Sequence, residues 1–369
     1  MSAPWPTLQF DEAVEDASGG NIKTKQNDYA EVGEFPIVDQ GKALIAGYTG
    51  DEAALCKVPL PVVIFGDHTR CLKFVDFPFG MGADGVKVLK PKAGLDAKFL
   101  YHYLRQIKLP DGGYDRHFKY LKRETVPLPP LEEQRRIAAI LDQAETLRTQ
   151  RRTALALLDS LTQSLFLDMF GDPVANPKGF TKQPLSEVAE ITTGSTPGRG
   201  SDGYYGGNIP WIKTTEVTGG EIHDTEEKLT ESGLKAIRGK LPPINSIVVA
   251  MYGQGQTRGR CALLRIEASC NQACGVVRPS EEFVPWFMFT QLLLAYERLR
   301  ALGRGGNQEN LNLQLLGSFE VLLPPLPLQQ TFATRIASIE ALKATHRRAL
   351  AALDALFASL QQRAFTGAL

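Results

Sequence analysis

The sequence predicts a mixed α+β chain in which two α/β domains are separated by two long antiparallel coiled-coil helices, with the two halves related by a pseudo-twofold duplication. Three observations predict this fold class. A long segment with coiled-coil periodicity occurs twice, each copy follows a stretch of short β-like runs, and both copies open on the same proline-rich motif. We therefore expect domains over residues 1–128 and 173–323 and long helices over residues 129–172 and 324–369.

Composition sets the outer limits of this prediction. The chain has 369 residues, of which 43% are hydrophobic, so it can form two sizeable cores. Its 41 basic and 41 acidic residues give a formal net charge of zero. This balance disfavours a protein that coats nucleic acid through bulk charge, although a net sum does not register local basic faces.

The first predicted domain, residues 1–128, contains short runs of β-forming residues, for example at 35–38 and 61–65. Glycine and aspartate separate these runs, and a helical stretch follows over residues 97–107. This mixture predicts an α/β domain.

The first long helix opens on Pro-Pro-Leu-Glu-Glu-Gln at residues 129–134, and the motif recurs as Pro-Pro-Leu-Pro-Leu-Gln at residues 324–329. The two copies then align without a gap as far as Phe170 and Phe365, and 17 of the 42 aligned positions are identical. A period this long indicates a duplicated domain-plus-helix unit, because solenoid repeats are much shorter.

Seam positions in both copies alternate steps of three and four residues, which predicts a coiled-coil seam. The predicted seam positions are Ile137, Ile140, Ala144, Leu147, Arg151, Ala154, Leu158, Leu161 and Leu165, then Phe332, Arg335, Ile339, Leu342, His346, Ala349, Leu353, Leu356 and Leu360. At the equivalent positions Arg151 and His346, a polar side chain can fix the register or simply extend from a loosely packed turn toward water. Gly171 and Pro173 predict the end of the first helix, and Pro327 is favourable near the start of the second.

Each long helix needs an apolar partner, and the other copy is the obvious one. A pseudo-twofold duplication makes such a pair antiparallel. A helix of roughly 40 residues spans about 60 Å, whereas one turn of DNA spans roughly 34 Å. We expect a rod that can hold two domains about one duplex turn or more apart.

The second predicted domain, residues 173–323, again contains short β-like runs, at 247–251 and 261–266, and a helix near 284–302. Its sequence aligns only loosely with that of the first domain. Similar helices beneath divergent domains indicate one common frame that carries two different functional surfaces.

Motifs of catalytic or metal chemistry are missing from the sequence. It has no phosphate-binding loop of the Gly-x-x-x-x-Gly-Lys-Ser/Thr type, no dinucleotide fingerprint and no Asn/Asp-Pro-Pro-aromatic motif of an amino-methyltransferase. The five cysteines have no zinc spacing, and the five histidines form no cluster in sequence. With neither a signal peptide nor a membrane-length apolar run, we expect a soluble cytoplasmic protein with no catalytic site and no bound metal.

Polar, glycine-rich loops are the remaining candidates for function. Gln and Asn can bond adenine in a bidentate manner, Arg can bond guanine, and Lys, Thr and loop N–H groups suit phosphates. In the second domain the candidate DNA-binding residues are Thr196, Arg199, Lys213, Thr214, Thr215, Tyr252, Gln254, Gln256, Arg258, Arg260, Arg304, Asn307 and Gln308. In the first domain they are Lys42, Thr49, His68, Thr69, Arg70, Arg116, His117 and Lys119. The alternative for each is an ordinary polar turn, and for Tyr252 and Trp211 it is packing.

Several motifs resemble those of the specificity subunits of type I restriction–modification systems. They are Thr-Gly-Ser-Thr-Pro at 193–197, Gly-Asn-Ile-Pro-Trp-Ile at 207–212, the loop at 250–259 followed by Asn-Gln at 271–272, and the helix-opening motif that occurs twice. The resemblance covers almost the whole chain. The first domain departs from the pattern, and we interpret Phe-Pro-Ile-Val-Asp at 35–39 as its counterpart of Ile-Pro-Trp-Ile.

The resemblance implies that two α/β target-recognition domains each read one half of a split double-stranded DNA target. It also implies that the helices set the unread gap. Two methyltransferase subunits would dock along the helices, and motor–nuclease subunits would join for restriction. S-adenosylmethionine, ATP and Mg would be bound by these partners and not by this chain, which would have no turnover alone and no contact with membranes.

Three alternatives stay open on the sequence. The chain could be a nuclease or methyltransferase with a cryptic site, a coiled-coil adaptor that holds two protein-binding domains, or the specificity subunit of a methylation-only system. The missing motifs disfavour the first. The zero net charge suits the second, but two divergent domains on a shared frame fit sequence reading better.

Overall fold

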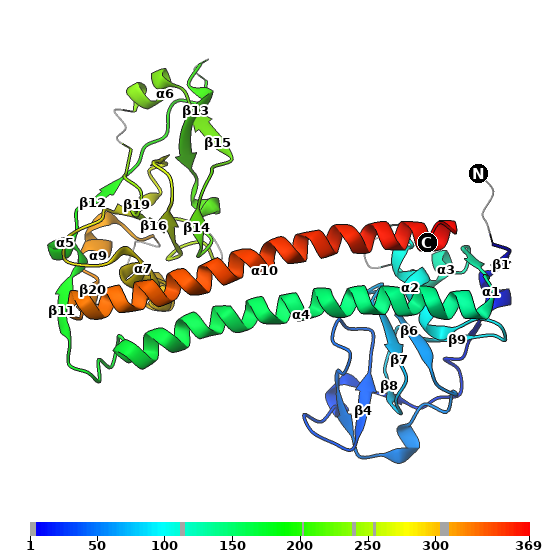
Figure 1. Ribbon diagram of the computed structural model, residues 1–369. Helices are drawn as coiled ribbons and strands as arrows, with labels where there is room; N and C mark the ends of the chain where they lie inside the picture. The colour runs from blue at the N-terminus through cyan, green and yellow to red at the C-terminus, as the bar shows by residue number, and fades with distance from the viewer. Residues whose placement is uncertain (1–4, 111–114, 201–202, 238–240, 254–255, 303–309) are drawn as a thin grey trace. The chain divides into compact units, whose positions relative to one another are not determined.

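A computed structural model describes residues 5–110, 115–200, 203–237, 241–253, 256–302 and 310–369 of the chain (Figure 1). The chain forms two compact units. Unit 1 comprises Met1–Arg152 with Arg348–Leu369, and unit 2 comprises Thr153–Arg347. Two long helices, α4 (Leu131–Phe170) and α10 (Leu326–Thr366), each contribute one part to unit 1 and the other part to unit 2.

Unit 1 is built around two four-stranded sheets, whose strand orders are β2-β9-β6-β7 and β3-β8-β4-β5, and a strand pair, β1-β10. The bounds are β1 (Thr7–Gln9), β2 (Val14–Asp16), β3 (Lys23–Thr24), β4 (Phe35–Val38), β5 (Gly47–Thr49), β6 (Val62–Gly66), β7 (Leu72–Val75), β8 (Gly80–Gly82), β9 (Val86–Pro91) and β10 (Thr125–Pro127). Successive residues of β6 point to opposite faces. Val62 and Ile64 join one apolar cluster with the second sheet, and Val63 and Phe65 join the cluster that includes the helices.

The helices of unit 1 are α1 (Phe10–Ala13), α2 (Ala97–Gln106) and α3 (Phe118–Leu121). Polar contacts attach α2 to α4. The buried ring of His102 places Nε2 2.7 Å from Oδ1 of Asp142, and Lys98 Nζ lies 3.2 Å from the other oxygen of that carboxylate. Arg105 reaches Glu145 at 3.7 Å. Burial alone would raise the pKa of Asp142, but the contacts with His102 and Lys98 outweigh it and lower the pKa.

Unit 2 repeats the topology of unit 1. Its five-stranded sheet has the order β12-β19-β16-β17-β14, in which the first four strands match β2-β9-β6-β7, and β15-β13-β18 form a second sheet beside the pair β11-β20. The bounds are β11 (Thr181–Pro184), β12 (Ile191–Thr193), β13 (Tyr205–Ile212), β14 (Glu221–Ile222), β15 (Glu227–Leu229), β16 (Ile247–Ala250), β17 (Cys261–Leu264), β18 (Ser269–Cys270), β19 (Cys274–Val277) and β20 (Glu320–Leu323). The predicted duplication therefore extends from the helices to the strand order of the divergent domains.

Aromatic packing attaches the long helices within unit 2. Its shorter helices are α5 (Leu185–Val188), α6 (Glu231–Ala236), α7 (Pro285–Leu294), α8 (Tyr296–Leu302) and α9 (Leu313–Gly317). Phe287 of α7 packs against Phe166 and Phe170 of α4, and Phe332 of α10 completes the cluster. The Phe170 and Phe287 ring centroids are 4.7 Å apart. Unit 1 also packs α2 and α4 in one buried apolar cluster and adds ion pairs at its edge, whereas the cluster of unit 2 is built largely of aromatic rings.

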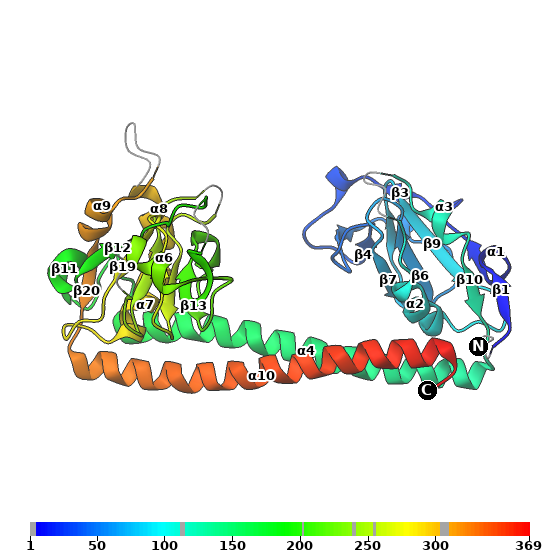
Figure 2. The same ribbon diagram turned by 90° about the horizontal axis from the view of Figure 1, so that it is seen from above.

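The two long helices lie side by side and run antiparallel within each unit, as predicted (Figures 1 and 2). In unit 1, Arg148 of α4 contacts Asp354 of α10, and Arg136 reaches Leu369. In unit 2, Asp159 of α4 contacts Lys343 of α10. The end of α4 is also as predicted, because Gly171 has a φ of +78° and its N–H donates to the carbonyl of Leu167.

The predicted seam is largely right. Thirteen of the eighteen predicted positions are buried or half-buried, namely Ile137, Ile140, Ala144, Arg151, Ala154, Leu158, Leu165, Phe332, Ile339, His346, Ala349, Leu353 and Leu360. Five are wrong, because Arg335 is exposed, Leu147 and Leu161 are 37% and 47% exposed, and Leu342 and Leu356 are 46% and 50% exposed. The residues that directly follow these five turn inward instead: Arg148, Thr162, Ile336, Lys343 and Phe357.

Leu147 and Arg148 lie three and four residues after Ala144, and Leu342 and Lys343 lie three and four residues after Ile339. Both spacings fit a seam, and apolarity alone favours the leucines. These two cations nevertheless lie at the seam because each bonds a carboxylate of the facing helix. No helix in the described parts of the chain combines the length and apolarity needed to cross a membrane.

Candidate nucleic-acid interface

A tight loop between β6 and β7 carries the predicted contact residues His68, Thr69 and Arg70. Thr69 and Arg70 are exposed, and His68 is half-buried. Arg70 has a φ of +61°, and its N–H donates to the carbonyl of Gly66 at 2.7 Å. The loop is therefore a closed turn that presents an arginine in a fixed backbone conformation.

Asp67 connects this loop to the start of α3. It is only 5% exposed, and its Oδ1 accepts a hydrogen bond of 2.8 Å from the N–H of Phe118. Its carbonyl accepts another of 2.8 Å from the N–H of His117. The predicted residues Arg116, His117 and Lys119 are thereby brought beside the loop, although they are some fifty positions away in sequence.

His117 itself is a correction to the predicted surface. Its ring is 1% exposed, and Nδ1 lies 3.1 Å from the carbonyl oxygen of Asp67. It therefore packs beneath the loop. Lys119 is exposed, but its Nζ is 2.7 Å from Asp115, and this hydrogen bond helps to lower the pKa of Asp115 to about 2.

Two further candidates of unit 1 lie on separate segments. The hydroxyl of Thr69 donates to the carbonyl of Gln40, so the loop that carries exposed Lys42 lies beside the β6–β7 loop. Thr49 is at the end of β5, where its hydroxyl accepts the N–H of Asp51 at 3.1 Å. Among the described residues, no hydrogen bond joins Thr49 to Thr69, and Thr49 lies outside the cluster.

The equivalent loop of unit 2 runs between β16 and β17 and is longer. Tyr252 is 41% exposed, Gln256 is exposed, and Arg258 and Arg260 are half-buried. Arg260 Nη2 donates to the side chain of Gln256 at 3.1 Å. The N–H of Leu311 donates to the carbonyl of Met251 at 3.0 Å, as that of His117 does to Asp67 in unit 1. Gln254, Arg304, Asn307 and Gln308 lie outside the described residues.

The Gly-Ser-Thr-Pro motif at 194–197 joins the two sheets of unit 2. The N–H of Ser195 donates to the carbonyl of Cys270 at 2.9 Å, and Trp211 Nε1 donates to the carbonyl of Ser195 at 3.0 Å. Gly194 is required because the backbone of Cys270 occupies the space of a Cβ. Trp211 is 1% exposed and is core packing, and Thr196 bonds the side chain of Gln272.

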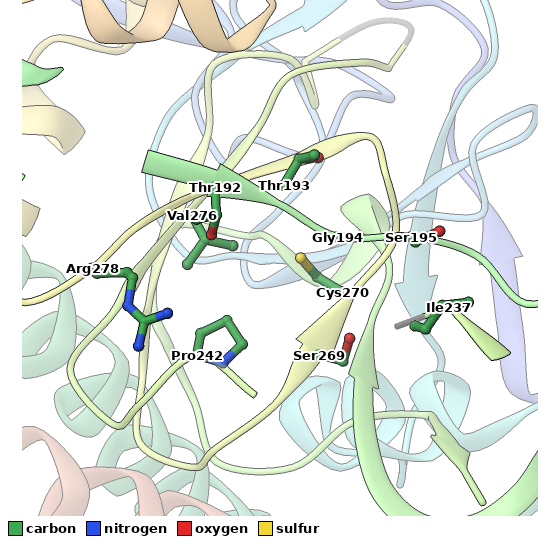
Figure 3. A pocket seen from close by; sticks show the side chains of 10 residues that line it. All are labelled: Thr192, Thr193, Gly194, Ser195, Ile237, Pro242, Ser269, Cys270, Val276 and Arg278. Carbon is green, nitrogen blue, oxygen red and sulfur yellow. The ribbon is translucent and has the colours of Figure 1, made fainter. Parts of the chain in front are cut away.

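A pocket of about 300 Å³ lies beside this motif (Figure 3). Thr192 and Ser195 line it on the motif side, and Ser269, Cys270 and Arg278 line it elsewhere. Ile237, which follows α6, and Pro242 complete the lining, so the pocket lies beside the junction of the two sheets. We assign no ligand to it.

Acidic residues neutralise two of the predicted cations of unit 2. Arg199 lies 2.9 Å from Glu227, and Lys213 lies 2.7 Å from Glu226 and 3.4 Å from Glu227. The hydrogen bond with Glu226 raises the pKa of Lys213. Burial would raise the pKa of Glu227, but Arg199 and Lys213 outweigh it and lower the pKa. Sequence reasoning missed both acids, which precede and begin β15.

The two threonines that follow Lys213 lie in one turn of 3₁₀ helix, Thr214–Glu216. Thr215 is exposed and Thr214 is half-buried. The N–H of Lys213 donates to the side chain of Glu216 at 2.8 Å, which holds the turn at the end of β13. The turn therefore presents the exposed hydroxyl of Thr215 next to Lys213, whose charge the two glutamates neutralise.

Strand pairing supports the interpretation of residues 35–39 as the counterpart of Ile-Pro-Trp-Ile. β4 pairs with β8 in parallel, with Ile37 opposite Gly80, and β13 pairs with β18 in parallel, with Trp211 opposite Ser269. Pro36 and Pro210 each precede this residue. The residues that sequence reasoning missed in unit 1 are Asp67 and Gln40, and the available signal was a polar residue directly or closely after a buried strand.

The candidate residues thus form one loop cluster at the end of β6 in unit 1 and two linked groups in unit 2. The N–H groups of Met251 and Tyr252 both point at the carbonyl of Ala273, next to Gln272, which bonds Thr196. This arrangement offers hydroxyl, amide and guanidinium groups on short loops. Among the described residues, no three His, Cys, Asp or Glu side chains lie where they could hold a metal ion.

The sequence model of one protein family, described as the type I restriction modification DNA specificity domain, matches residues 7–156 and again residues 177–354. The EcoR124I/EcoR124II specificity subunit of Escherichia coli is 25% identical over 325 residues, which cover 83% of this chain and 79% of that protein. The MjaIX specificity subunit of Methanocaldococcus jannaschii is 20% identical over 273 residues, 67% of this chain and 63% of that protein.

Solved structures show the same fold. A type I restriction–modification S subunit from M. genitalium matches with a TM-score of 0.68 at 14% identity, over 99% of this chain and 96% of that one. A chain from a study of complex assembly in the type I R-M system matches with a TM-score of 0.52 at 17% identity, over 99% and 98%. Because the family match covers both predicted domains and much of both helices, this chain belongs to the type I restriction–modification specificity subunits.

Proposed function

We propose that this chain is the non-catalytic, DNA-reading subunit of a cytoplasmic type I restriction–modification complex, and that each unit reads one half of a split double-stranded target. The observation that carries the proposal is the repeated architecture with different loops. β6 and β16 have the same neighbours in sheets of the same order, yet five residues connect β6 to β7 and ten connect β16 to β17. A common frame with unlike loops suits two unlike half-sites.

The chemistry of these loops supports base reading. In unit 1 the closed turn presents Arg70, which suits guanine, and in unit 2 Arg258 and Gln256 add guanidinium and amide groups. The neutralisation of Arg199 and Lys213 by acids fits the zero net charge of the chain. Affinity would then depend on many short-range contacts, with most phosphate binding left to partner subunits.

Exposed leucines on the long helices support docking of two copies of one partner. Unit 1 exposes three of them, and unit 2 exposes the three that are equivalent in the repeat together with Leu157 and Leu167, which have no leucine counterpart in unit 1. The first set is Leu131, Leu147 and Leu356, and the second is Leu326, Leu342 and Leu161. Apolar residues turned outward, while cations occupy the seam, indicate surfaces that a partner covers. We propose that two methyltransferase subunits bind these leucine surfaces and that motor–nuclease subunits join for restriction.

Cofactor chemistry belongs to those partners in this proposal. S-adenosylmethionine would be bound by the methyltransferase subunits, and ATP with Mg by the motor–nuclease subunits. This chain would contribute only the choice of sequence and the spacing between the two halves.

Methylome sequencing tests the proposal directly. The chain is expressed with its candidate methyltransferase subunit in a host that lacks DNA methylation, and each protein is omitted in turn as a control. A split motif with methylated adenine in both halves, seen only when both proteins are present, is the expected result. If both proteins are soluble and associated but no new methylation occurs, the adaptor function is favoured instead.

A further inference from the structure

Gln134, the last residue of the helix-opening motif of α4, is fully buried and uses every hydrogen-bonding group of its side chain. Its Nε2 donates to the carbonyls of Gly94 and Pro129, both at 2.8 Å. Its Oε1 accepts the N–H of Asp96 at 2.7 Å. Asp96 is the N-cap of α2, so the glutamine joins the start of α4 to the start of the domain helix.

Gln329 repeats this arrangement at the start of α10. It is also fully buried, and its Nε2 donates to the carbonyl of Pro324 at 2.8 Å. Its Oε1 accepts the N–H of Val284, the N-cap of α7, at 2.8 Å. The same side chain therefore binds the same element in both units, although the surrounding sequences differ.

The position of this contact in the fold is informative. α2 packs on β6, β7 and β9, the strands whose ends carry the predicted contact loops, and α7 packs on β17 in unit 2. Backbone N–H groups at the start of a helix have no partner within that helix. The glutamine oxygen accepts one of them, the N–H of the N-cap residue, while its amide group bonds the proline turn of the long helix. Together with the apolar clusters, this contact restrains the angle between each domain and its helix.

We propose that Gln134 and Gln329 are positioning residues that set how strictly the distance between the two half-sites is measured. This inference rests on the proposed function. One added base pair moves a half-site by roughly 3.4 Å along the duplex and rotates it by about 35°. A domain held rigidly on its helix rejects such a displaced half-site, and a domain that can tilt accepts it.

The test uses the full chain with its methyltransferase subunit and reads the lengths of the gaps at methylated sites. Gln134→Leu and Gln329→Leu remove the polar contacts at similar volume, and Gln143→Leu changes an exposed glutamine of α4 as the matched control. We expect each buried variant to raise methylation at gaps one base pair longer or shorter, relative to the normal gap, by about two- to tenfold. The bases read in each half should not change.

Each outcome decides a separate point. Unchanged gap lengths in both variants, with a normal motif for the unaltered chain, would overturn the positioning role. If the unaltered chain gives no split motif, the proposed function itself fails. Should the leucine variants not fold, Gln134→Met and Gln329→Met keep an unbranched neutral side chain of similar length and lose both amide donors. These variants should show the same relaxation, and a strict gap in them would also overturn the role.

Discussion

Arg148 of α4 and Asp354 of α10 form an ion pair with 2.6 Å between Nε and Oδ1, and the same repeat positions form a second pair in unit 2, where Lys343 lies 2.8 Å from Asp159. Glu145 and Glu340 complete the two clusters at 2.6 and 2.7 Å from Arg148 and Lys343. The acids that bind these two cations, Glu145 and Glu340 with Asp159 and Asp354, are thus among the identical residues by which the repeat is recognised in the sequence.

A double-mutant cycle should detect the first pair. The side chain of Arg148 is only 15% exposed, and its truncation leaves Asp354 with Arg152 alone, at 3.2 Å. We expect Arg148→Ala and Asp354→Ala to show a coupling energy of about 0.5–3 kcal/mol in urea unfolding. The exposed pair Arg135–Glu132 is the control and should couple by less than about 1 kcal/mol. Purely additive effects for Arg148 and Asp354 would show that the contact contributes nothing.

The outward-facing leucines should matter for binding and not for folding. Leu147→Asp is expected to change the free energy of unfolding by within about 0.5 kcal/mol, because the side chain is exposed. It should nevertheless reduce copurification of the methyltransferase subunit. Leu141→Ala is the opposite case: this leucine is fully buried, and its truncation should cost about 2–5 kcal/mol. Normal partner binding by both Leu147→Asp and Leu342→Asp would rule out the leucine surfaces as docking sites.

A heptad insertion tests whether the helices act as a ruler. Seven residues placed after Arg151 lengthen α4 by about 10 Å and keep the seam on the same face. Because α10 is not lengthened, we expect the gap in the DNA target to become longer or methylation to be lost. The methylome of the insertion variant distinguishes these results. An unchanged gap at full activity would contradict the ruler.

Arg258 offers a test of base reading in unit 2. It is half-buried, and its Nε has no hydrogen-bond partner among the described residues. Arg258→Ala should weaken discrimination in one half-site by about 1–3 kcal/mol if a bidentate contact is lost. Arg260→Ala is a suitable comparison, because Arg260 already bonds Gln256. Competition binding with single-base variants of the target measures both, and unchanged recognition by Arg258→Ala would exclude this residue.

An exchange of residues 1–128 for the equivalent segment of another specificity subunit should change only one half of the target. The segment ends before the helix-opening motif, so Gln134 and its partner Pro129 are retained, whereas the residues equivalent to its partners Gly94 and Asp96 come from the inserted domain. Loss of specificity in both halves would mean that the units do not read independently.

The parts of the fold that could be predicted from the sequence are those that the internal repeat and the helix signals specify. The helix pair, its antiparallel direction and the end at Gly171 follow from periodicity and from helix-terminating residues. The seam could not be fully predicted, because Leu147 looks like a core residue and Arg148 does not until Asp354 is placed opposite it. Long-range partners of this kind are invisible to a local pattern.

The candidate surface shows the same limit. The loops that carry Arg70 and Arg258 were identified from composition alone. The burial of His117 and the pairing of Lys213 with Glu226 depend on segments that meet only in three dimensions. A polar residue in a loop segment is equally consistent with a contact residue and with a buried anchor.

The two domains are attached to their long helices by apolar cores with different borders. In unit 1, residues of α2 and α4 share one buried apolar cluster, and Asp142, which is 40% exposed, adds ion pairs with His102 and Lys98 at its edge. In unit 2, phenylalanine rings of α7, α4 and α10 form the cluster. Cooling weakens the hydrophobic contribution in both units, whereas added salt screens the partly exposed ion pairs of unit 1. If each unit reads one half of the target as proposed, ionic strength should therefore relax recognition of one half-site more than that of the other.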